Sequence, residues 1–263
     1  MIFIGEKING LQPAIYKLIQ DRNQEAIQEL ARRQTQAGAD YLDLNTGTAW
    51  LRPAEVMAWL VDTVQEAVPT PLAIDSRRLD VVEAGLRSCR NPAMINSTSG
   101  EKEKLGRFME LAGRYGAAVV GLTMDEQGIP LHAVGRVAIA KRIMDFADSH
   151  GISRDRLYVD PIVLPMKFSQ SQGPVVLEAI RQLAREKTPP HVVVGLSNVS
   201  QGTRERRLIN RTFLTMAMAC GLDAVIGDVL DPQLYESAKA AEIILERQPY
   251  SDRFLKEVKR GVA

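Results

Sequence analysis

Four polar residues end short apolar runs, and their side chains are of types that bind ligands or assist chemistry. Asp75 ends LAID, Asn96 ends AMIN, Asp160 ends LYVD and Asn198 directly follows VVVGLS. A carboxylate or carboxamide at the end of a buried run needs a hydrogen-bonding partner, because burying an unpaired polar group costs free energy. Four such residues on four separate runs therefore predict a site for a polar ligand.

Similar residues end other runs and would extend this site into a ring. Its further members are Glu6, Asn9, Asp43, Asn45, Ser76, Ser97, Thr123, Ser197 and Asp228. Ser76, Ser97 and Asp228 also fit helix caps. A ring of acceptors and amides with little positive charge suits a neutral ligand that is rich in N–H donors. A 2-amino-4-oxo pterin is such a ligand, because its ring N–H and exocyclic amine can donate two parallel bonds to one carboxylate.

Positive charge gathers after one run only, VVVGLS. The residues are Arg204, Arg206, Arg207 and Arg211. The cluster fits the glutamate tail of a folate or the acidic surface of a partner protein. A basic helix face in contact with water would give the same pattern.

The runs that carry the ring alternate with stretches of helical period. The candidate strands are residues 2–4, 41–44, 72–75, 93–96, 118–123, 157–160, 192–197 and 224–227. Helix-ending glycines stand at Gly38, Gly116, Gly151 and Gly221, and helix-starting prolines at Pro53 and Pro232. The pattern predicts an α/β fold, a (β/α)8 TIM barrel with its active site at the carboxyl ends of the strands. The alternative, an open doubly wound sheet, would have GxGxxG where this sequence reads GEKING.

Length and composition set the broad class. The 263 residues suit one barrel and contain no linker, so we expect a single domain over 1–263 with a terminal helix over 250–263. A net charge of +1 and an aromatic content of 5% argue against nucleic-acid binding as the main function. No signal peptide and no apolar run long enough to span a membrane are visible, so we expect a cytoplasmic protein.

Histidines and cysteines do not predict a metal site. His132, His150 and His191 map to a loop, a helix end and the opposite end of a strand, and no CxxC motif occurs. His132, in PLHAVG, is similar to the histidine of corrinoid-binding domains, but Pro130 stands where that motif has Asp. We therefore expect neither a bound metal nor a corrinoid held by this chain.

The residues at the ends of these apolar runs, taken in order along the chain, resemble those of the pterin-binding methyltransferases. This family includes methyltetrahydrofolate:corrinoid (iron-sulfur) protein methyltransferases and the folate domain of cobalamin-dependent methionine synthase. The matching segments are GEKING at 5–10, LDLNTG at 42–47, AIDS at 73–76, AMINSTSGE at 93–101, GLTM at 121–124, YVDPIVLP at 158–165, GLSNVSQ at 195–201 and LINRTFLTMAMACGLDAVIGD at 208–228. The resemblance implies methyl transfer between N5 of tetrahydrofolate and the cobalt of a corrinoid, in the acetyl-CoA pathway or in O- or N-demethylation.

The resemblance also implies roles for the four polar residues. Asp160 resembles the carboxylate that holds the pterin ring N–H and amine, with Asp75 and Asn96 as further pterin contacts. Asn198 resembles the asparagine beside N5, whose hydrogen bond strengthens as the methyl group leaves. Asn198 and Asp75, through which a proton could pass, are therefore the implied catalytic residues.

The remaining implied contacts follow the seventh candidate strand. Gly195 and Ser197 would shape the wall of the pocket, and Gln201 and Arg206 would contact the rest of the folate. Arg207 could take the place of Arg206, because GTRERR is the segment least similar to the family.

The resemblance further implies a homodimer, with tetrahydrofolate or 5-methyltetrahydrofolate as substrate. The corrinoid would come from a separate protein, because the eight units leave too few residues for a second domain. Two alternatives remain: a non-catalytic folate-binding module, and an enzyme like dihydropteroate synthase. The latter would have a lysine in the strand that reads GLSN and an Arg-x-His-like ending after the strand that reads IGDV.

Overall fold

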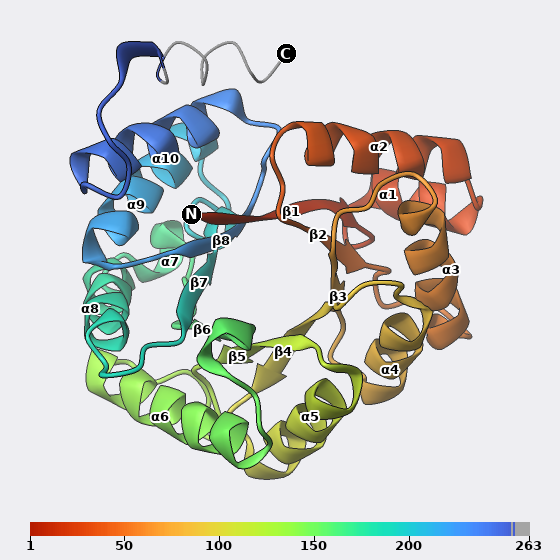
Figure 1. The fold of residues 1–263 in the computed structure, drawn as a ribbon, viewed down its shortest axis with the longest axis horizontal. Helices are drawn as coiled ribbons and strands as arrows, with labels where there is room; N and C mark the ends of the chain where they lie inside the picture. Colours follow the sequence, from red (N-terminus) through yellow and green to blue (C-terminus); the bar gives the residue numbers. More distant parts are fainter. Residues whose placement is uncertain (254, 256–263) are drawn as a thin grey trace.

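Eight parallel strands form a closed barrel in the computed structural model, which describes residues 1–253 and 255. Neighbours in sequence pair with each other, and the first strand pairs with the last (Figure 1). The strands are β1 (Ile2–Asn9), β2 (Tyr41–Asn45), β3 (Leu72–Asp75), β4 (Met94–Ser99), β5 (Ala118–Leu122), β6 (Leu157–Asp160), β7 (His191–Gly195) and β8 (Ala224–Gly227). The predicted (β/α)8 barrel is confirmed.

Helices surround the barrel and cover its outer face (Figure 1). They are α1 (Pro13–Gln20), α2 (Gln24–Gln36), α3 (Pro53–Gln65), α4 (Leu79–Ser88), α5 (Lys102–Tyr115), α6 (Ala133–Ser149), α7 (Met166–Ser169), α8 (Gln172–Ala184), α9 (Arg206–Cys220) and α10 (Pro232–Ile244). Two short 3-10 turns, η1 (Arg154–Arg156) and η2 (Leu196–Asn198), lie before β6 and after β7. The apolar side chains of the helices pack on those of the strands in one continuous core.

The predicted helix ends have the expected backbone geometry. Gly116 and Gly221 follow α5 and α9 with φ of 62° and 115°, a left-handed conformation that glycine adopts without steric penalty. Pro53 and Pro232 are the first residues of α3 and α10.

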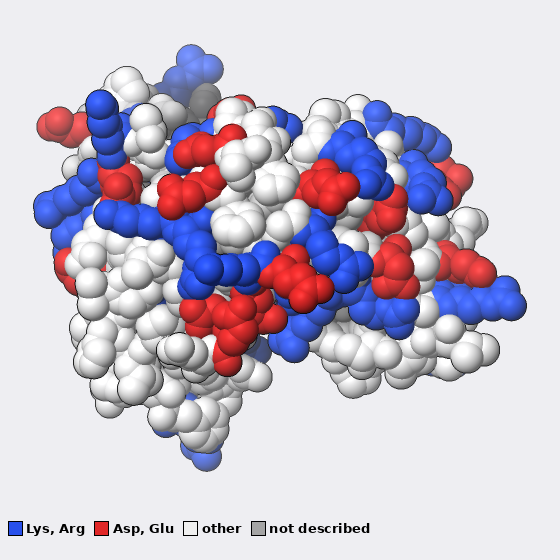
Figure 2. All heavy atoms as spheres, turned by 90° about the horizontal axis from the view of Figure 1, so that it is seen from below, with Lys and Arg blue, Asp and Glu red and all other residues white. Residues whose placement is uncertain are grey.

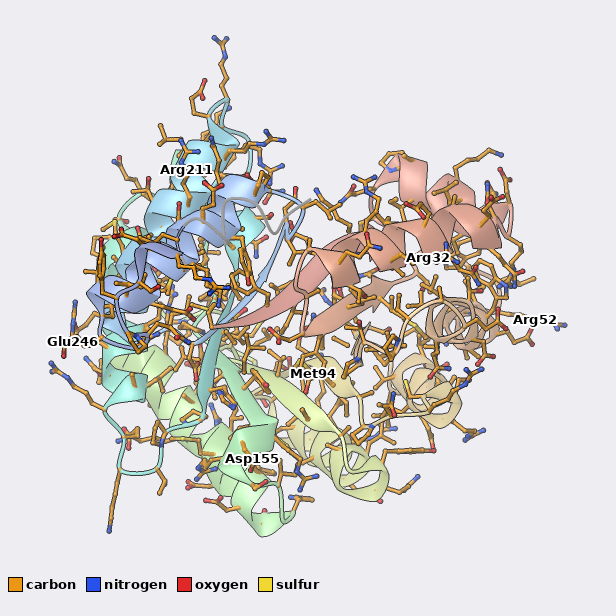
Figure 3. All side chains as sticks on the ribbon, turned by 45° about the horizontal axis from the view of Figure 1, so that its top comes forward. Arg32, Arg52, Met94, Asp155, Arg211 and Glu246 are labelled. Atoms are coloured by element: carbon orange, nitrogen blue, oxygen red, sulfur yellow. The ribbon has the colours of Figure 1, made fainter. Side chains whose placement is uncertain are left out.

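A layer of apolar side chains fills the inside of the barrel. Its buried members are Ile4, Ala73, Met94, Ala118, Val120, Tyr158, Val193 and Ala224. Figure 3 shows Met94 near the centre of the barrel, while Arg52 and Glu246 lie at its periphery. The barrel is therefore a packed core, and a ligand can enter only at an end.

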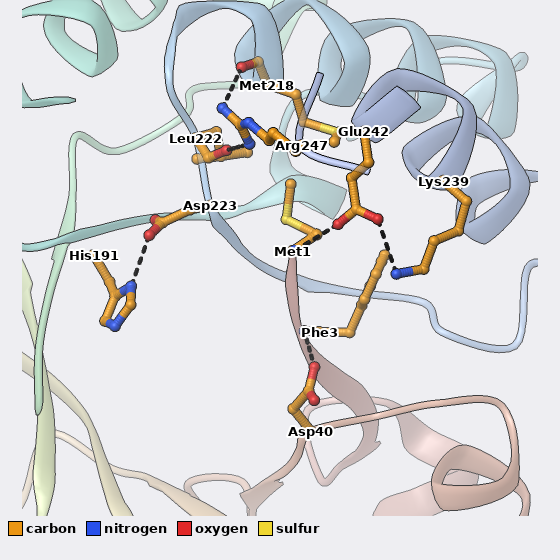
Figure 4. Close-up of polar contacts among 10 residues, drawn as sticks. All are labelled: Met1, Phe3, Asp40, His191, Met218, Leu222, Asp223, Lys239, Glu242 and Arg247. Atoms are coloured by element: carbon orange, nitrogen blue, oxygen red, sulfur yellow. Dashed lines mark hydrogen bonds and ion pairs between the residues drawn. The ribbon is translucent and has the colours of Figure 1, made fainter. Parts of the chain in front are cut away.

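At the amino-terminal end of the barrel, side chains join neighbouring strands (Figure 4). Asp40, before β2, accepts a hydrogen bond from the Phe3 amide of β1 at 2.7 Å. Asp223, before β8, accepts bonds of 2.7 Å from both His191 Nδ1 and the Val192 amide of β7. These contacts stabilise the end opposite the predicted site.

Four predictions about element ends are wrong. β4 continues to Ser99, so Ser97 lies within a strand and caps no helix, and β1 extends well past residue 4. The N-cap of α10 is Asp231 and not Asp228, and the N-cap of α4 is Arg78 and not Ser76. Most of the terminal helix that we expected over 250–263 lies outside the described residues.

Charges of both signs alternate on the face that Figure 2 shows, without a large patch of one sign. Over residues 1–253 and 255, no helix has both the length and the apolar character needed to cross a membrane.

Candidate functional site

Strand alternation points the predicted polar residues into the carboxyl end of the barrel, which we call the mouth. Residues two apart in a strand face the same side. Ala73 and Tyr158 lie inside the barrel, so Asp75 and Asp160, two residues further along, also point inward. The same spacing places Asn96 above the interior apolar layer. The mouth is therefore polar, whereas the layer below it is apolar.

Carboxamides and carboxylates of β2, β3 and β4 hold one another in this mouth. Asn45 Nδ2 donates to Asp75 Oδ2 at 2.7 Å, and Asn96 Nδ2 donates to Asp43 Oδ1 at 2.9 Å. Asp75 and Asn96 are also paired in the register of β3 and β4. Two of the predicted residues are thus adjacent, and each is oriented by a neighbour from β2.

Burial raises the pKa of three carboxyl groups on adjacent strands. The pKa of Asp43 lies well above its ordinary value, because the group is buried and, second, because the Asp75 carboxylate repels its charge. Burial also raises the pKa of Asp75 and of Glu6, while hydrogen bonds from Asn45 and Ser197 oppose the rise. This side of the mouth can therefore keep a proton at a pH where isolated carboxyl groups are ionised.

Asp160 ends β6 as a buried carboxyl group with main-chain donors. Its exposed fraction is 6%, and its Oδ1 accepts a bond of 2.6 Å from the Ile162 amide. Burial raises the pKa of Asp160 to about 6, against the opposing effects of the Ile162 and Gly195 amides and the positive charge of Arg136. At neutral pH this group is therefore a carboxylate of fixed orientation.

The turn η2 carries the predicted catalytic residue Asn198. Its side chain is exposed and lines a cleft at the mouth. A Cβ atom at Gly195 would lie 3.0 Å from Asn198 Nδ2, which is closer than most such contacts. Glycine at 195 therefore leaves room for the carboxamide in this position.

Side chains on both flanks hold this turn in place. Ser197 Oγ donates to Glu6 Oε1, which joins η2 to β1 across the barrel closure. Arg206 donates from Nη2 to the Ser197 carbonyl at 3.0 Å and from Nε to Ser200 Oγ at 3.1 Å. The guanidinium of Arg206 is thus bound to the segment that presents Asn198.

A cleft of about 550 Å³ opens beside η2. Its lining residues are Glu6, Lys7, Asn9, Gln12, Ser197, Asn198, Gln201, Arg206, Arg207, Asn210, Asp228, Asp231 and Leu234. Four predicted site residues, Ser197, Asn198, Gln201 and Arg206, therefore share one cleft. Asp75, Asn96 and Asp160 do not line it and belong to the strands inside the mouth.

Sequence reasoning missed the partners that orient the predicted residues. Asp43, Asn45 and Glu6 were recognised as members of the ring, but their hydrogen bonds to Asn96, Asp75 and Ser197 were not foreseen. Strand alternation could have indicated them, since they follow inward-facing positions at spacings of two. Arg136 was missed altogether, although it lies alone among the apolar residues of AVGRVAIA.

The three histidines lie apart from one another. His132 is the N-cap of α6, His150 binds the Phe146 carbonyl at the end of that helix, and His191 begins β7. Within the part of the chain that the structure describes, no three His, Cys, Asp or Glu side chains are grouped to hold a metal ion.

Known proteins are similar in sequence to this chain over most of its length. Methylcorrinoid:tetrahydrofolate methyltransferase of Eubacterium limosum is 32% identical over 264 residues, covering 99% of this chain and 97% of the relative. The methionine synthases of Mycobacterium leprae and Mycobacterium tuberculosis are 28% and 29% identical, and each match covers 86% of this chain. The chain spans only 20% of the length of each methionine synthase.

Solved structures share the fold. A dihydropteroate synthase of Xanthomonas albilineans, in complex with indole-2-carboxylic acid and 6-chloroguanine, has a TM-score of 0.71 at 19% identity, covering 95% of this chain and 94% of the other. The dihydropteroate synthase of Thermus thermophilus has a TM-score of 0.66 at 20% identity, covering 93% of this chain and 92% of the other. The family described as pterin binding enzyme matches residues 13–228, and the chain belongs to this family.

Proposed function

We propose that this pterin-binding enzyme is a methyltransferase that moves a methyl group between N5 of tetrahydrofolate and the cobalt of a corrinoid on another protein. The observation that carries the proposal is the ring of buried carboxylates and carboxamides inside the mouth. It occurs in a chain that aligns over 99% of its length with a methylcorrinoid:tetrahydrofolate methyltransferase.

The pterin would lie in the mouth with its N–H edge toward β6. The Asp160 carboxylate, held by main-chain amides, can accept the ring N–H and the exocyclic amine in two parallel bonds. Asp75 and Asn96, adjacent on β3 and β4, supply further polar contacts. The apolar layer below would stop the ring at this depth.

Asn198 would act on the nitrogen that carries the methyl group. When tetrahydrofolate takes up a methyl group from a methylcorrinoid, N5 attacks the methyl carbon, the cobalt keeps the bonding electron pair, and N5 bears positive charge until its proton leaves. In the reverse direction a methyl group on a neutral tertiary amine leaves poorly, because the departing nitrogen would bear negative charge. The Asn198 amide can donate to N5, or accept from N5–H once it is protonated, and such contacts strengthen as charge develops. The exposed position of Asn198 also places it where an incoming cobalt centre would approach.

The carboxyl groups of β1, β2 and β3 support the transfer of a proton from or to N5. Asp43 and Asp75 are buried close enough for their charges to interact, and Glu6 adds a third charge. Asp75, which we propose as the carboxyl group nearest to the folate, can accept the N5 proton into this group as tetrahydrofolate takes up the methyl group, and can return a proton to N5 in the reverse direction. Asn45 keeps the Asp75 carboxylate oriented for that transfer.

The rest of the folate would extend into the cleft beside η2. Gln201, Arg206 and Arg207 line this cleft and offer donors for the carboxylates of a glutamate tail. Two guanidinium nitrogens of Arg206 donate to its own segment, whereas the guanidinium of Arg207 lies 3.9 Å from the Asp231 carboxylate. We propose that both arginines contribute, Arg206 chiefly by holding the turn.

A separate corrinoid protein would cover the mouth during transfer. Large apolar side chains are exposed at this end of the barrel. Leu11, Leu51 and Leu131 lie in segments that connect strands to helices, and Val134, Phe168 and Leu208 lie in the first turns of α6, α7 and α9. Exposed apolar groups arranged around a polar opening are typical of a surface that binds another protein. The name of the Eubacterium limosum relative gives methylcorrinoid as the donor, and we propose this direction here.

We also propose that residues 1–263 form one domain and that the protein is a homodimer. The dimer rests on family resemblance. Light scattering at micromolar concentration is expected to give twice the mass of the 29.1 kDa chain, and a monomer would contradict it.

One assay tests the proposed function against its alternatives. The purified enzyme is incubated with tetrahydrofolate and free methylcobalamin, and the formation of 5-methyltetrahydrofolate is followed by chromatography. We expect saturable turnover that depends on the enzyme. Folate binding without turnover would indicate a non-catalytic module, and dihydropteroate formed from a pterin diphosphate and 4-aminobenzoate would indicate a synthase.

A further inference from the structure

Arg136 is a fully buried arginine that lies outside the residues assigned above. It belongs to the first turn of α6, and its exposed fraction is 0%. Burying a guanidinium is costly unless its donors are satisfied. The hydrogen-bond partners of Arg136 must therefore compensate for the cost of burying its charge.

Four hydrogen bonds join Arg136 to two connections at the mouth and to the start of α8. Nε donates to the Pro130 carbonyl at 3.0 Å, ahead of α6. Nη1 donates to the carbonyls of Pro161 and Ile162 at 2.6 and 2.7 Å, just after β6. Nη2 donates to Gln172 Oε1 at 2.7 Å, at the start of α8. These acceptors are all uncharged.

One peptide group links Arg136 to Asp160. The Pro161 carbonyl, which accepts from Arg136, and the Ile162 N–H, which donates to Asp160 Oδ1, belong to the same peptide unit. A cation at the carbonyl polarises this unit and strengthens its N–H as a donor. The charge of Arg136 also acts directly on Asp160, since it opposes the rise in the pKa of that carboxyl group.

The backbone at this link has an unusual conformation. Ile162 has φ of 62°, in the left-handed region that β-branched residues rarely adopt. Hydrogen bonds to both carbonyls from Arg136 and from the amide to Asp160 hold the residue there. Without the guanidinium, the loop can relax to a more favourable φ and turn the Ile162 amide away from Asp160.

We propose that Arg136 is a positioning residue that sets the orientation of the Asp160 carboxylate for the pterin, acting through the Pro161–Ile162 peptide. That the ligand is a pterin rests on the proposed function. The hydrogen bonds from Arg136 through the Pro161–Ile162 peptide to Asp160 belong to the free protein. Lysine cannot replace arginine fully, because one ammonium cannot reach four acceptors arranged around a planar fork.

A double-mutant cycle tests the inference with tetrahydrofolate as the probe. Calorimetry is expected to show about tenfold to thirtyfold weaker binding for Arg136→Met, with Arg136→Lys in between. In the Asp160→Ala background the same Arg136→Met change should have almost no further effect. Losses that multiply in the two backgrounds, or an unchanged affinity in Arg136→Met, would overturn the proposal.

The matched control is Arg142→Met, on the same helix. Arg142 is partly buried, and its Nη2 lies 2.6 Å from Asp125 Oδ2 in the segment ahead of α6. Its removal is expected to leave the folate affinity within about twofold. A loss as large as that of Arg136→Met would mean that any damage to α6 weakens binding, and would reject a specific role.

A second measurement needs no ligand. Hydrogen exchange by NMR compares the Ile162 amide with the Val159 amide of β6, which corrects for global stability. Relative exchange at Ile162 should rise at least about tenfold in Arg136→Met and stay unchanged in Arg142→Met. If Arg136→Met does not fold, Gln172→Leu serves instead, because it removes the acceptor of Arg136 Nη2. The relative exchange at Ile162 should then rise about threefold.

The two measurements separate the failures of the two proposals. If the wild-type protein binds no tetrahydrofolate, the proposed function fails, and the Ile162 exchange still decides whether Arg136 orders the Asp160 contact. Unchanged exchange in both Arg136→Met and Gln172→Leu would overturn the positioning role even if folate binds.

Discussion

Among the predicted site residues, Asp160 has the surroundings best suited to binding a pterin. Replacing it with alanine removes a charge-assisted acceptor of two bonds. We expect tetrahydrofolate affinity to fall by about 2–4 kcal/mol, measured by calorimetry. Unchanged affinity would remove Asp160 from the pterin site. Asp21→Ala, at an exposed carboxylate that pairs with Lys17, is the control.

The same residue predicts a pH dependence of binding. The pKa of Asp160 is raised by burial to about 6, so in the free protein the group gains a proton below that pH. A pterin that requires the ionised form must then compete with this proton. The contribution of Asp160 to the affinity should be constant above about pH 7 and fall toward tenfold per pH unit well below 6. In Asp160→Asn this contribution should disappear, whereas those of Asp43, Asp75 and Glu6 would persist.

Asn198 is expected to affect the rate more than the binding of folate. Its contact with N5 strengthens only as the nitrogen gains charge, so Asn198→Ala should lower kcat by about 10²–10³. The tetrahydrofolate dissociation constant should change by less than about tenfold. Single-turnover kinetics beside calorimetry separates the two quantities. Equal losses in both would make Asn198 a plain binding residue.

At the scale of elements, the number and order of the strands could be predicted from sequence, whereas the additional short helices α1 and α7 and several element ends could not. Alternating apolar runs and helical stretches indicate a barrel because parallel strands need helical connections. Ser97 was misread as a cap because β4 continues beyond Asn96, where its register with β5 shifts. Such a shift depends on the neighbouring strand and has no local signal.

In the candidate site, too, some features could be predicted from sequence and others could not. Which strand ends carry Asp75, Asn96 and Asp160 follows from alternation, which depends on sequence alone. The hydrogen bonds of Arg206 and Arg136 depend on where α9 and α6 begin relative to the loops beside them. Side chains this long reach several elements, so their partners are fixed only by the complete fold.

At the amino-terminal end of the barrel, the hydrogen bonds of Asp223 are expected to contribute to the free energy of unfolding. Asp223 accepts from the Val192 amide and from His191, so Asp223→Ala should lower the free energy of unfolding by about 1–3 kcal/mol (Figure 4). The hydrogen bond to Asp223 raises the pKa of His191. The contribution of the histidine is therefore complete below about pH 6.5 and lost as pH rises through the raised value.

Urea denaturation of the wild type and the variant at several pH values measures this contribution. The difference between the two proteins should be smaller at pH 9 than at pH 6. Asp21→Ala, which breaks an exposed ion pair, should change the free energy of unfolding by less than about 1 kcal/mol. A difference that grows with pH would contradict the role assigned to His191.

At the scale of the whole molecule, the two ends of the barrel have different surfaces. The mouth is surrounded by exposed apolar side chains on several connections, whereas the opposite end is held by polar contacts between strands. This asymmetry fits an enzyme whose second substrate is carried by a protein. A corrinoid bound to a partner must reach the mouth, because the apolar layer blocks passage through the barrel.

The last prediction tests whether that partner docks on the apolar residues around the mouth. Leu51 is 98% exposed and Leu131 67%, so lysine at both positions should leave the fold intact. With free methylcobalamin, the double variant Leu51→Lys, Leu131→Lys should transfer methyl groups at the wild-type rate. With methylated corrinoid proteins of the same organism, purified and assayed one by one, its KM should rise about tenfold or more.

Ile244→Lys provides the matched control, since Ile244 is 80% exposed at the end of α10, away from the mouth. It should behave as wild type in both assays. An unchanged KM for the corrinoid protein in the double variant would place docking elsewhere. A loss with free methylcobalamin as well would show that the two leucines support the site itself, because the small substrate needs no docking surface.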